Sequence, residues 1–166
     1  MRSCLDREKL VITKANKYII IILGTCARKN HPMSKPKIII SEQDLNRLET
    51  MLEHQPKMTP TMMQLEDELA RAEVVLPQDI PKNVVTMNAR VSLTIAPSTL
   101  PVEVTLVYPH DFKGEKSQVN VIAPIGAAIL GLAEGQCIEW PQPNGELMKV
   151  TIEKVLFQPE REGDYL

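Results

Sequence analysis

Few side chains in this sequence have the type and spacing that chemistry requires. The densest acidic run is Glu66-Asp67-Glu68, which lies on a predicted helix. Three neighbouring carboxylates could hold a hard cation such as Mg²⁺ through their oxygen atoms. We favour a solvated helix face over a metal site for this run, and we expect Arg71 and Glu73 to face outward with it.

The candidate nucleophiles and metal ligands are scattered along the chain. No serine has a nearby base, and the sequence holds no nucleophile elbow, phosphate-binding loop or dinucleotide-binding glycine motif. The histidines are isolated and lack metal-ligand spacing: His31, His54 and His110. The cysteines are odd in number and far apart, which indicates a reducing cytoplasm and no disulfide framework: Cys4, Cys26 and Cys137. The sequence therefore predicts a protein that is not an enzyme and binds no cofactor or metal.

Composition and charge narrow the class of protein further. The 166 residues are 43% hydrophobic and 24% charged, as expected for one globular domain or one domain with a small appendage. The net charge of −2 is uneven, because residues 1–32 carry +5 and residues 33–166 carry −7. An acidic body lacks the positive surface that duplex phosphates require. We therefore expect contact with nucleic acid to be indirect, and a protein partner or small ligand fits better.

Residues 1–32 do not share the pattern of the remaining chain. Their apolar run, residues 18–23, is far shorter than the roughly 20 residues of a membrane-spanning helix, so no membrane association is expected. We favour an irregular extension, or sequence upstream of a start at Met33. A secretory or lipoprotein signal ending at Cys26 and a β-strand are the alternatives.

Residues 33–78 contain the pattern of two short helices. Ser41 can cap the first helix by accepting from the backbone three residues on, and Asp44 can reach back to complete the cap. Pro56 ends that helix, Pro60 begins the second and Pro77 stops it. Apolar residues at steps of three and four give each helix one apolar face: Leu45, Leu48 and Leu52, then Met62, Leu65, Leu69, Ala72 and Leu76. The pattern predicts an antiparallel helical hairpin.

Residues 79–166 change to the alternating pattern of β-strands. Strands are predicted at 84–95, 102–108, 118–122, 137–140 and 148–157, with a turn at Pro143-Asn144-Gly145. Pro124 opens one short helix that Gly131 ends, either as a C-cap or because another backbone approaches closely. The sequence therefore predicts an α+β protein whose antiparallel sheet curls over one short helix.

Two stretches carry a resemblance to known families. The run from Ala123-Pro124-Ile125-Gly126 to Gly135-Gln136, before the last hairpin, resembles the C-terminal domain of the Gre transcript-cleavage factors. The segments 84–91 and 105–109 and the ending 158–165 resemble the nucleoside diphosphate kinase regulator family, Rnk. The resemblance covers residues 33–166 and leaves residues 1–32 unmatched.

The resemblance implies a fold and a partner. The fold would be an FKBP-like C-terminal domain, and the partner would be RNA polymerase in the cytoplasm, bound at the rim of its secondary channel. Direct action on nucleoside diphosphate kinase or another metabolic enzyme is the alternative. The partner-binding residues would lie in the Gre-like run: Pro124, Ile125, Gly126, Ala128, Leu130, Gly131 and Gly135. Ile125 and Leu132 would be either core residues or parts of an exposed apolar patch.

The Gre resemblance does not extend to catalysis. Gre factors need clustered acidic residues at the hairpin tip to hold a metal ion, whereas this tip has Glu53 at its edge and Lys57 at its centre. The short hairpin also predicts too little reach, so we expect competition with Gre factors without transcript cleavage. An FKBP-like fold raises prolyl isomerase activity as another possibility, which we disfavour because the domain has few aromatic residues for a proline pocket: Tyr108, Phe112, Trp140, Phe157 and Tyr165.

Overall fold

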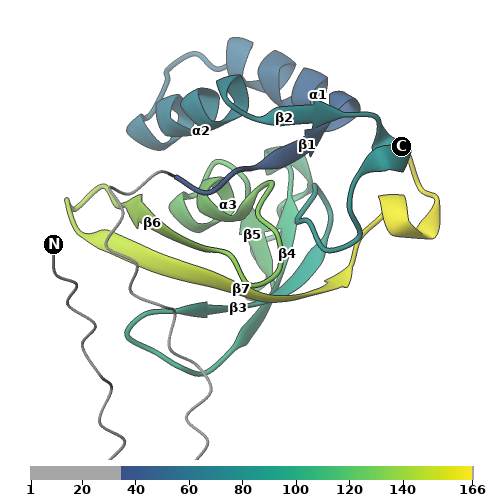
Figure 1. The fold of residues 1–166 in the computed structure, drawn as a ribbon. Coiled ribbons are helices and arrows are strands. Elements are labelled where there is room, and N and C mark those ends of the chain that lie inside the picture. The colour runs from purple at the N-terminus through teal and green to yellow at the C-terminus, as the bar shows by residue number, and fades with distance from the viewer. Residues whose placement is uncertain (1–34, 166) are drawn as a thin grey trace, which may run out of the picture. The chain divides into compact units, whose positions relative to one another are not determined.

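The computed structural model describes residues 35–165, so the predictions made for residues 1–32, including those for Cys4, Cys26 and His31, lie outside the described part of the chain (Figure 1). The described residues form α-helices (α), short 3-10 helices (η) and β-strands (β). In chain order they are β1 (Ile39–Ser41), α1 (Glu42–Glu53), α2 (Pro60–Ala70), β2 (Glu73–Val75), η1 (Pro77–Asp79), β3 (Arg90–Ile95), β4 (Val102–Val107), η2 (Pro109–Asp111), β5 (Gln118–Asn120), α3 (Pro124–Ile129), β6 (Cys137–Pro141), β7 (Leu147–Phe157) and η3 (Glu160–Glu162).

Both helices begin at the predicted residues, and each has a side-chain cap. The side chain of Ser41 accepts from the backbone N–H of Asp44 at 3.0 Å, and that of Thr59 accepts from Met62 at 3.3 Å. Each bond satisfies a backbone donor that the first helical turn leaves unpaired. Pro60 occupies the first turn of α2, where its missing N–H has no intrahelical role. The two helices lie side by side above the remaining structure (Figure 1).

The end of the second helix differs from the prediction. The helix stops at Ala70, and residues 73–75 form β2, which pairs in parallel with β1. The backbone N–H of Glu73 donates to the carbonyl of Ile38 at 3.0 Å. Leu76, predicted as the last apolar residue of the helix, is 47% exposed. The prediction for Leu76 was wrong because the β-branched Val74 and Val75 pair with a strand that lies 34 residues earlier.

The second sheet contains five strands in the order β5-β4-β3-β7-β6. Its strands pair antiparallel except for β4 and β5, which run parallel, with Thr105 opposite Gln118. The prediction of a wholly antiparallel sheet was therefore wrong at this edge, where η2 and the loop after it return the chain to the middle of β4, at Thr105. The α+β class, the curled sheet and its one short helix are confirmed.

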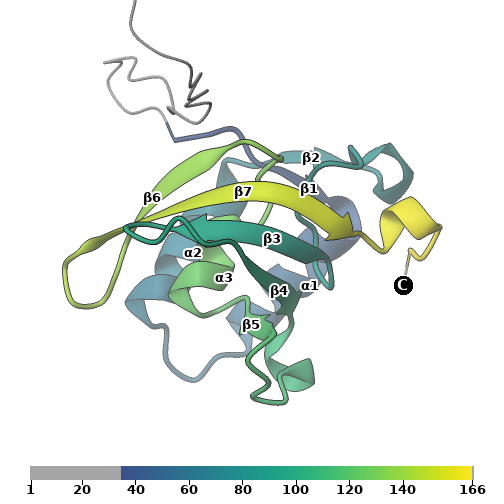
Figure 2. The ribbon, with the colours of Figure 1, turned by 90° about the horizontal axis from the view of Figure 1, so that it is seen from below.

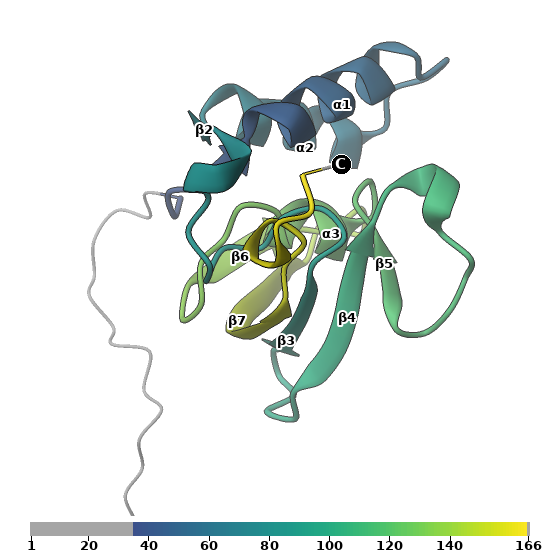
Figure 3. The same ribbon diagram turned by 90° about the vertical axis from the view of Figure 1, so that its right-hand side faces the viewer.

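A single hydrophobic core joins the helices to the five-stranded sheet. α3 lies between this sheet and the pair α1 and α2, as the views in Figures 1 and 3 show. Seen from below, β7 and β3 lie in front of the helices (Figure 2). Trp140 is only 2% exposed and belongs to this core. Residues from all of these elements are fully buried: Leu48, Leu65, Leu93, Leu106, Ile129, Leu132 and Ile152.

Candidate functional site

The Gre-like run is built around two glycines that allow close packing. A Cβ atom on Gly126 would lie 2.1 Å from the backbone oxygen of Asn120, a separation that real Cβ atoms do not show. Gly131 has φ of +75°, and a Cβ there would lie 2.9 Å from the Cβ of Ile38. Gly131 therefore both ends α3 and lets β1 approach, since its N–H donates to Val85 and its carbonyl accepts from Ile39.

The structure separates the seven predicted partner-binding residues into two groups. Four are buried: Gly126, Ala128, Leu130 and Gly131. Pro124 and Ile125 are half-buried at the start of α3, and Gly135 is exposed in the turn before β6. Leu132, for which core and patch were both open, is fully buried. Partner binding through this run stays a prediction, and direct contact is open to only three of these seven residues.

Pro124 and Ile125 line an apolar groove of about 630 Å³. Phe112, in the loop after η2, is 43% exposed and lines the same groove. The remaining residues come from β5, the turn before α3 and the β6–β7 hairpin: Gln118, Val119, Asn120, Ile122, Ala123, Gln142 and Met148. Sequence reasoning did not connect Phe112 with α3. The available signal was a single large aromatic residue in an otherwise polar loop.

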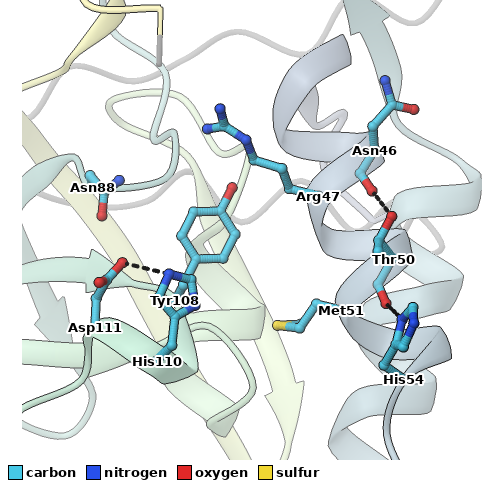
Figure 4. A pocket seen from close by; sticks show the side chains of 9 residues that line it. All are labelled: Asn46, Arg47, Thr50, Met51, His54, Asn88, Tyr108, His110 and Asp111. Atoms are coloured by element: carbon cyan, nitrogen blue, oxygen red, sulfur yellow. Dashed lines mark hydrogen bonds and ion pairs between the residues drawn. The ribbon is translucent and has the colours of Figure 1, made fainter.

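A second hollow, of about 690 Å³, lies between α1 and the end of β4 (Figure 4). One wall is a stripe along α1, in which the steps of one and three residues keep five side chains on one face: Asn46, Arg47, Thr50, Met51 and His54. The opposite wall comes from the five-stranded sheet and its connections: Asn88, Tyr108, His110 and Asp111. No sequence pattern predicted this site, because its two walls lie more than 30 residues apart in the chain.

The buried carboxylate of Asp44 holds Tyr108, one of the residues that line this hollow, in place. The Tyr108 hydroxyl donates to Asp44 Oδ1 at 2.9 Å, and the backbone N–H of Met87 donates to Oδ2 at 3.3 Å. Burial raises the pKa of Asp44, an effect that these two hydrogen bonds partly offset. Burial and the neighbouring Asp44 also raise the pKa of Tyr108, which therefore keeps its proton and remains a donor. The predicted role of Asp44 was a helix cap, and its contacts with the sheet were not foreseen.

The two histidines of the hollow are held by local contacts. The Nδ1 atom of His54 lies 2.7 Å from the carbonyl oxygen of Thr50. His110 Nε2 lies 3.1 Å from Asp111 Oδ2, and the imidazole of His110 stacks on the ring of Tyr108 with a centroid distance of 5.6 Å. Both orientations are visible in Figure 4. The histidines thus present ordered rings to the hollow rather than a metal site.

The acidic run on α2 is not wholly exposed. Glu68 is 2% exposed, and its carboxylate pairs with Lys35 at 2.7 Å and with Arg71. The prediction that Glu68 faces outward was therefore wrong, because Lys35 and Arg71 compensate the buried charge. Within residues 35–165 no group of three or more histidine, cysteine or acidic side chains could hold a metal ion. The same residues contain no helix long and apolar enough to cross a membrane.

Two family models match different parts of the chain. A family model described as the Rnk N-terminus matches residues 36–75. A second model, described as the C-terminal part of transcription elongation factor GreA/GreB, matches residues 80–157. The first model covers β1, α1, α2 and β2, and the second covers the five-stranded sheet with α3.

The individual relatives include both transcription elongation factors and a regulator of nucleoside diphosphate kinase. The chain is 30% identical over 101 residues to transcription elongation factor GreA of Prosthecochloris aestuarii, covering 60% of this chain and 63% of that protein. A solved structure described as prokaryotic transcription elongation factor GreA/GreB from Nitrosomonas europaea is 46% identical, with a TM-score of 0.61, and covers 74% of this chain and all of that one. The regulator of nucleoside diphosphate kinase of Escherichia coli K12 is 40% identical over 137 residues, which is 81% of this chain and 99% of that protein. The chain therefore belongs to the Rnk family of nucleoside diphosphate kinase regulators, whose C-terminal part is related to GreA and GreB.

Proposed function

We propose that this protein is a cytoplasmic, non-enzymatic regulator of transcription elongation that binds RNA polymerase at the rim of the secondary channel. It competes there with Gre factors and does not promote transcript cleavage. The observation that carries the proposal is the groove at the start of α3. There two accessible residues of the Gre-like run, Pro124 and Ile125, meet the exposed ring of Phe112 in one apolar surface. Protein interfaces commonly have such an apolar centre with an aromatic residue.

The absence of cleavage is supported by the connection between α1 and α2. Its exposed side chains are Glu53, His54, Pro56, Lys57 and Thr59, which include one carboxylate and a lysine. The helices on either side contain 12 and 11 residues, so each is about 17 Å long at 1.5 Å per residue. A metal-holding tip needs several oxygen ligands within about 2.1 Å of Mg²⁺. This connection offers neither the ligands nor the reach.

A competition experiment tests the docking half of the proposal. Labelled protein is bound to core RNA polymerase and displaced with a Gre factor. Phe112→Ala and Ile125→Glu should each weaken binding at least tenfold, which corresponds to about 1.4 kcal/mol. Leu100→Glu is the matched control, because Leu100 is 74% exposed in the β3–β4 turn and lies outside the groove. Binding that survives both groove variants, or that a Gre factor does not displace, would overturn the rim proposal.

Direct action on nucleoside diphosphate kinase is the second candidate function. It is favoured by the printed description of the Escherichia coli relative as a regulator of that kinase. Purified kinase and core polymerase are offered separately to immobilised protein, and the kinase activity is measured with and without it. Retention of the kinase together with a change in its activity would support this candidate. Retention of polymerase alone would support the first.

A further inference from the structure

The hollow between α1 and η2 has features that polymerase docking at α3 does not use. Its volume of about 690 Å³ is in the range of sites for small organic ligands, which is about 300–1,000 Å³. None of its nine lining residues lines the docking groove. Its position between the helical part and the five-stranded sheet is also typical of ligand sites, which prefer the junctions between structural units.

The sheet side of the hollow provides a surface for stacking. The imidazole of His110 lies nearly parallel to the ring of Tyr108, at an interplanar angle of 19°. Tyr108 is 6% exposed and anchored by its hydrogen bond to Asp44, whereas the His110 side chain is 74% exposed. One face of His110 is therefore covered by a fixed ring, and the other can accept a further planar ring. Stacking of bases on such rings tolerates any nucleobase, since every base has a π-face.

The helix side of the hollow provides cationic and donor groups for an anion. Arg47 and His54 lie seven residues apart on the same face of α1, about two turns along the helix. The guanidinium of Arg47 interacts with the Tyr108 hydroxyl and lowers the pKa of Asp44. It therefore lies beside the Tyr108 hydroxyl, as Figure 4 shows. The Nδ1–H of His54 donates to the Thr50 carbonyl, so Nε2 donates to a phosphate oxygen when the imidazole is protonated. Arginine and histidine donors suit a phosphate group in particular.

The remaining groups fit the polar edge of a base and a sugar. Asn46 and Asn88 provide amide donors and acceptors on opposite walls, and Asp111 provides an acceptor beside His110. Asn88 has φ of +59°, an uncommon conformation that its backbone hydrogen bonds maintain: its N–H donates to Leu106 at 2.8 Å. Residues held in such conformations cluster at ligand sites. The hollow thus combines a stacking ring, a basic wall and amide groups within mononucleotide dimensions.

We propose that this hollow binds a nucleoside diphosphate, with the base stacked on His110 and the two phosphates directed to Arg47 and His54. The ribose lies between the two walls, and its hydroxyl groups donate to Asp111. A bound nucleotide would contact α1 on one side and η2 on the other, and it would therefore stabilise the present arrangement of the helices on the sheet. Binding requires no polymerase, so its test is independent of the proposed docking function.

Calorimetric titration of the full chain with ADP and with GDP tests this site. We expect saturable binding of either nucleotide with a dissociation constant below about 1 mM. Guanosine and inorganic pyrophosphate serve as separate probes of the two halves, and each should bind more weakly than GDP. Amide shifts on adding GDP should centre on residues 46–54 and 108–111. No saturable binding of ADP or GDP at millimolar concentration, or shifts centred on the α3 groove, would overturn the proposal.

Three variants assign the two halves of the site. His110→Ala should reduce GDP affinity at least tenfold and leave pyrophosphate affinity unchanged, because it removes only the stacking surface. His54→Gln should reduce the affinity for both GDP and pyrophosphate. Arg90→Gln is the control, since Arg90 is exposed on β3 and does not line the hollow. GDP affinity that is unchanged by His110→Ala and His54→Gln, or that falls equally with Arg90→Gln, would show that the nucleotide binds elsewhere.

Discussion

Asp44 shows how one side chain connects the helical part of the molecule with the sheet. It lies in the first turn of α1, and its carboxylate accepts hydrogen bonds from residues 43 and 64 positions later, Met87 and Tyr108. A buried carboxylate is unfavourable unless such donors compensate it. Burial still dominates, which is why the pKa of Asp44 lies above its ordinary value of 3.8. At a given pH a larger fraction of Asp44 is therefore protonated in the folded protein than in the unfolded chain.

Asp44→Asn should change how stability depends on pH. A raised folded-state pKa means that the folded protein binds more protons than the unfolded chain between pH 3.8 and the raised value. The stabilisation from that proton is complete below about pH 3.8 and is lost as pH rises through the folded pKa. The free energy of unfolding of the wild-type protein minus that of Asp44→Asn should therefore fall as pH rises. Urea titrations between pH 4 and 8 measure this difference.

Glu160 provides the check on this interpretation. Burial raises its pKa as well, and Thr86 donates to its carboxylate at 2.7 Å. Glu160 is present in both proteins, and Asp44 is only a minor cause of its raised pKa, so most of its contribution cancels in the difference. A difference that stayed constant with pH, or that rose with pH, would contradict a raised pKa for Asp44.

Gly126→Ala should destabilise the fold although alanine favours helices. The added Cβ would meet the backbone oxygen of Asn120 at 2.1 Å, and backbone atoms cannot move aside as a flexible side chain can. We expect a loss of about 1–3 kcal/mol, the usual range for overpacking, measured by urea unfolding. Pro124→Ala, two residues earlier in α3, should cost less than about 1 kcal/mol and should weaken polymerase binding instead. Equal stability of Gly126→Ala and the wild-type protein would contradict the close approach.

At the scale of helices and strands, the sequence pattern correctly predicted the features that depend on residues close together in the chain. Ser41 and Pro60 mark helix starts through contacts within one turn, and the turn at Gly145, with φ of +85°, joins β6 to β7 as expected. The predictions failed where the structure of a segment depends on contacts with residues far away in the sequence. Leu76 leaves the helix because residues 73–75 pair with β1, and β5 runs parallel because η2 and the loop after it carry the chain back along β4. Glu68 is buried because Lys35 lies beside it.

Leu65→Ala should destabilise the helices and the sheet together. Leu65 is fully buried in α2 and belongs to the core that also contains residues of the sheet. Truncation of a buried leucine costs about 2–5 kcal/mol. Far-ultraviolet circular dichroism follows the helices, and the fluorescence of Trp140, the single tryptophan of the chain, follows β6. Both signals should shift to lower urea concentration by the same amount.

Met63→Ala is the matched control on the same helix. Met63 is 53% exposed, so its truncation should change the free energy of unfolding by less than about 0.5 kcal/mol. If Leu65→Ala shifted only the circular dichroism signal and left the Trp140 transition in place, the shared core would not couple the two parts.

At the scale of the whole molecule, the two candidate sites are formed by segments that meet only after folding. The docking groove joins the loop after η2 to α3 and the β6–β7 hairpin, and the hollow joins α1 to η2. Sequence similarity drew attention to Pro124 and Ile125, but it could not separate them from Gly126, Ala128 and Leu130, whose burial depends on the sheet. The resemblance therefore located the segment, and the packing determined which residues are accessible.

The connection between α1 and α2 allows the separation of docking from cleavage to be tested. Gln55→Glu with Lys57→Asp would place three carboxylates, with Glu53, within five residues while retaining the Thr59 cap of α2. We expect this variant to compete with a Gre factor for polymerase and still not shorten transcripts. The reason is geometric: helices of 12 and 11 residues extend about 17 Å, so added oxygen ligands stay too far from the catalytic metal to bind it. Backtracked elongation complexes, with a Gre factor as the positive control, provide the measurement. Transcript shortening by the variant but not by the wild-type protein would show that charge rather than reach prevents cleavage, and shortening by the wild-type protein would contradict the proposed function itself.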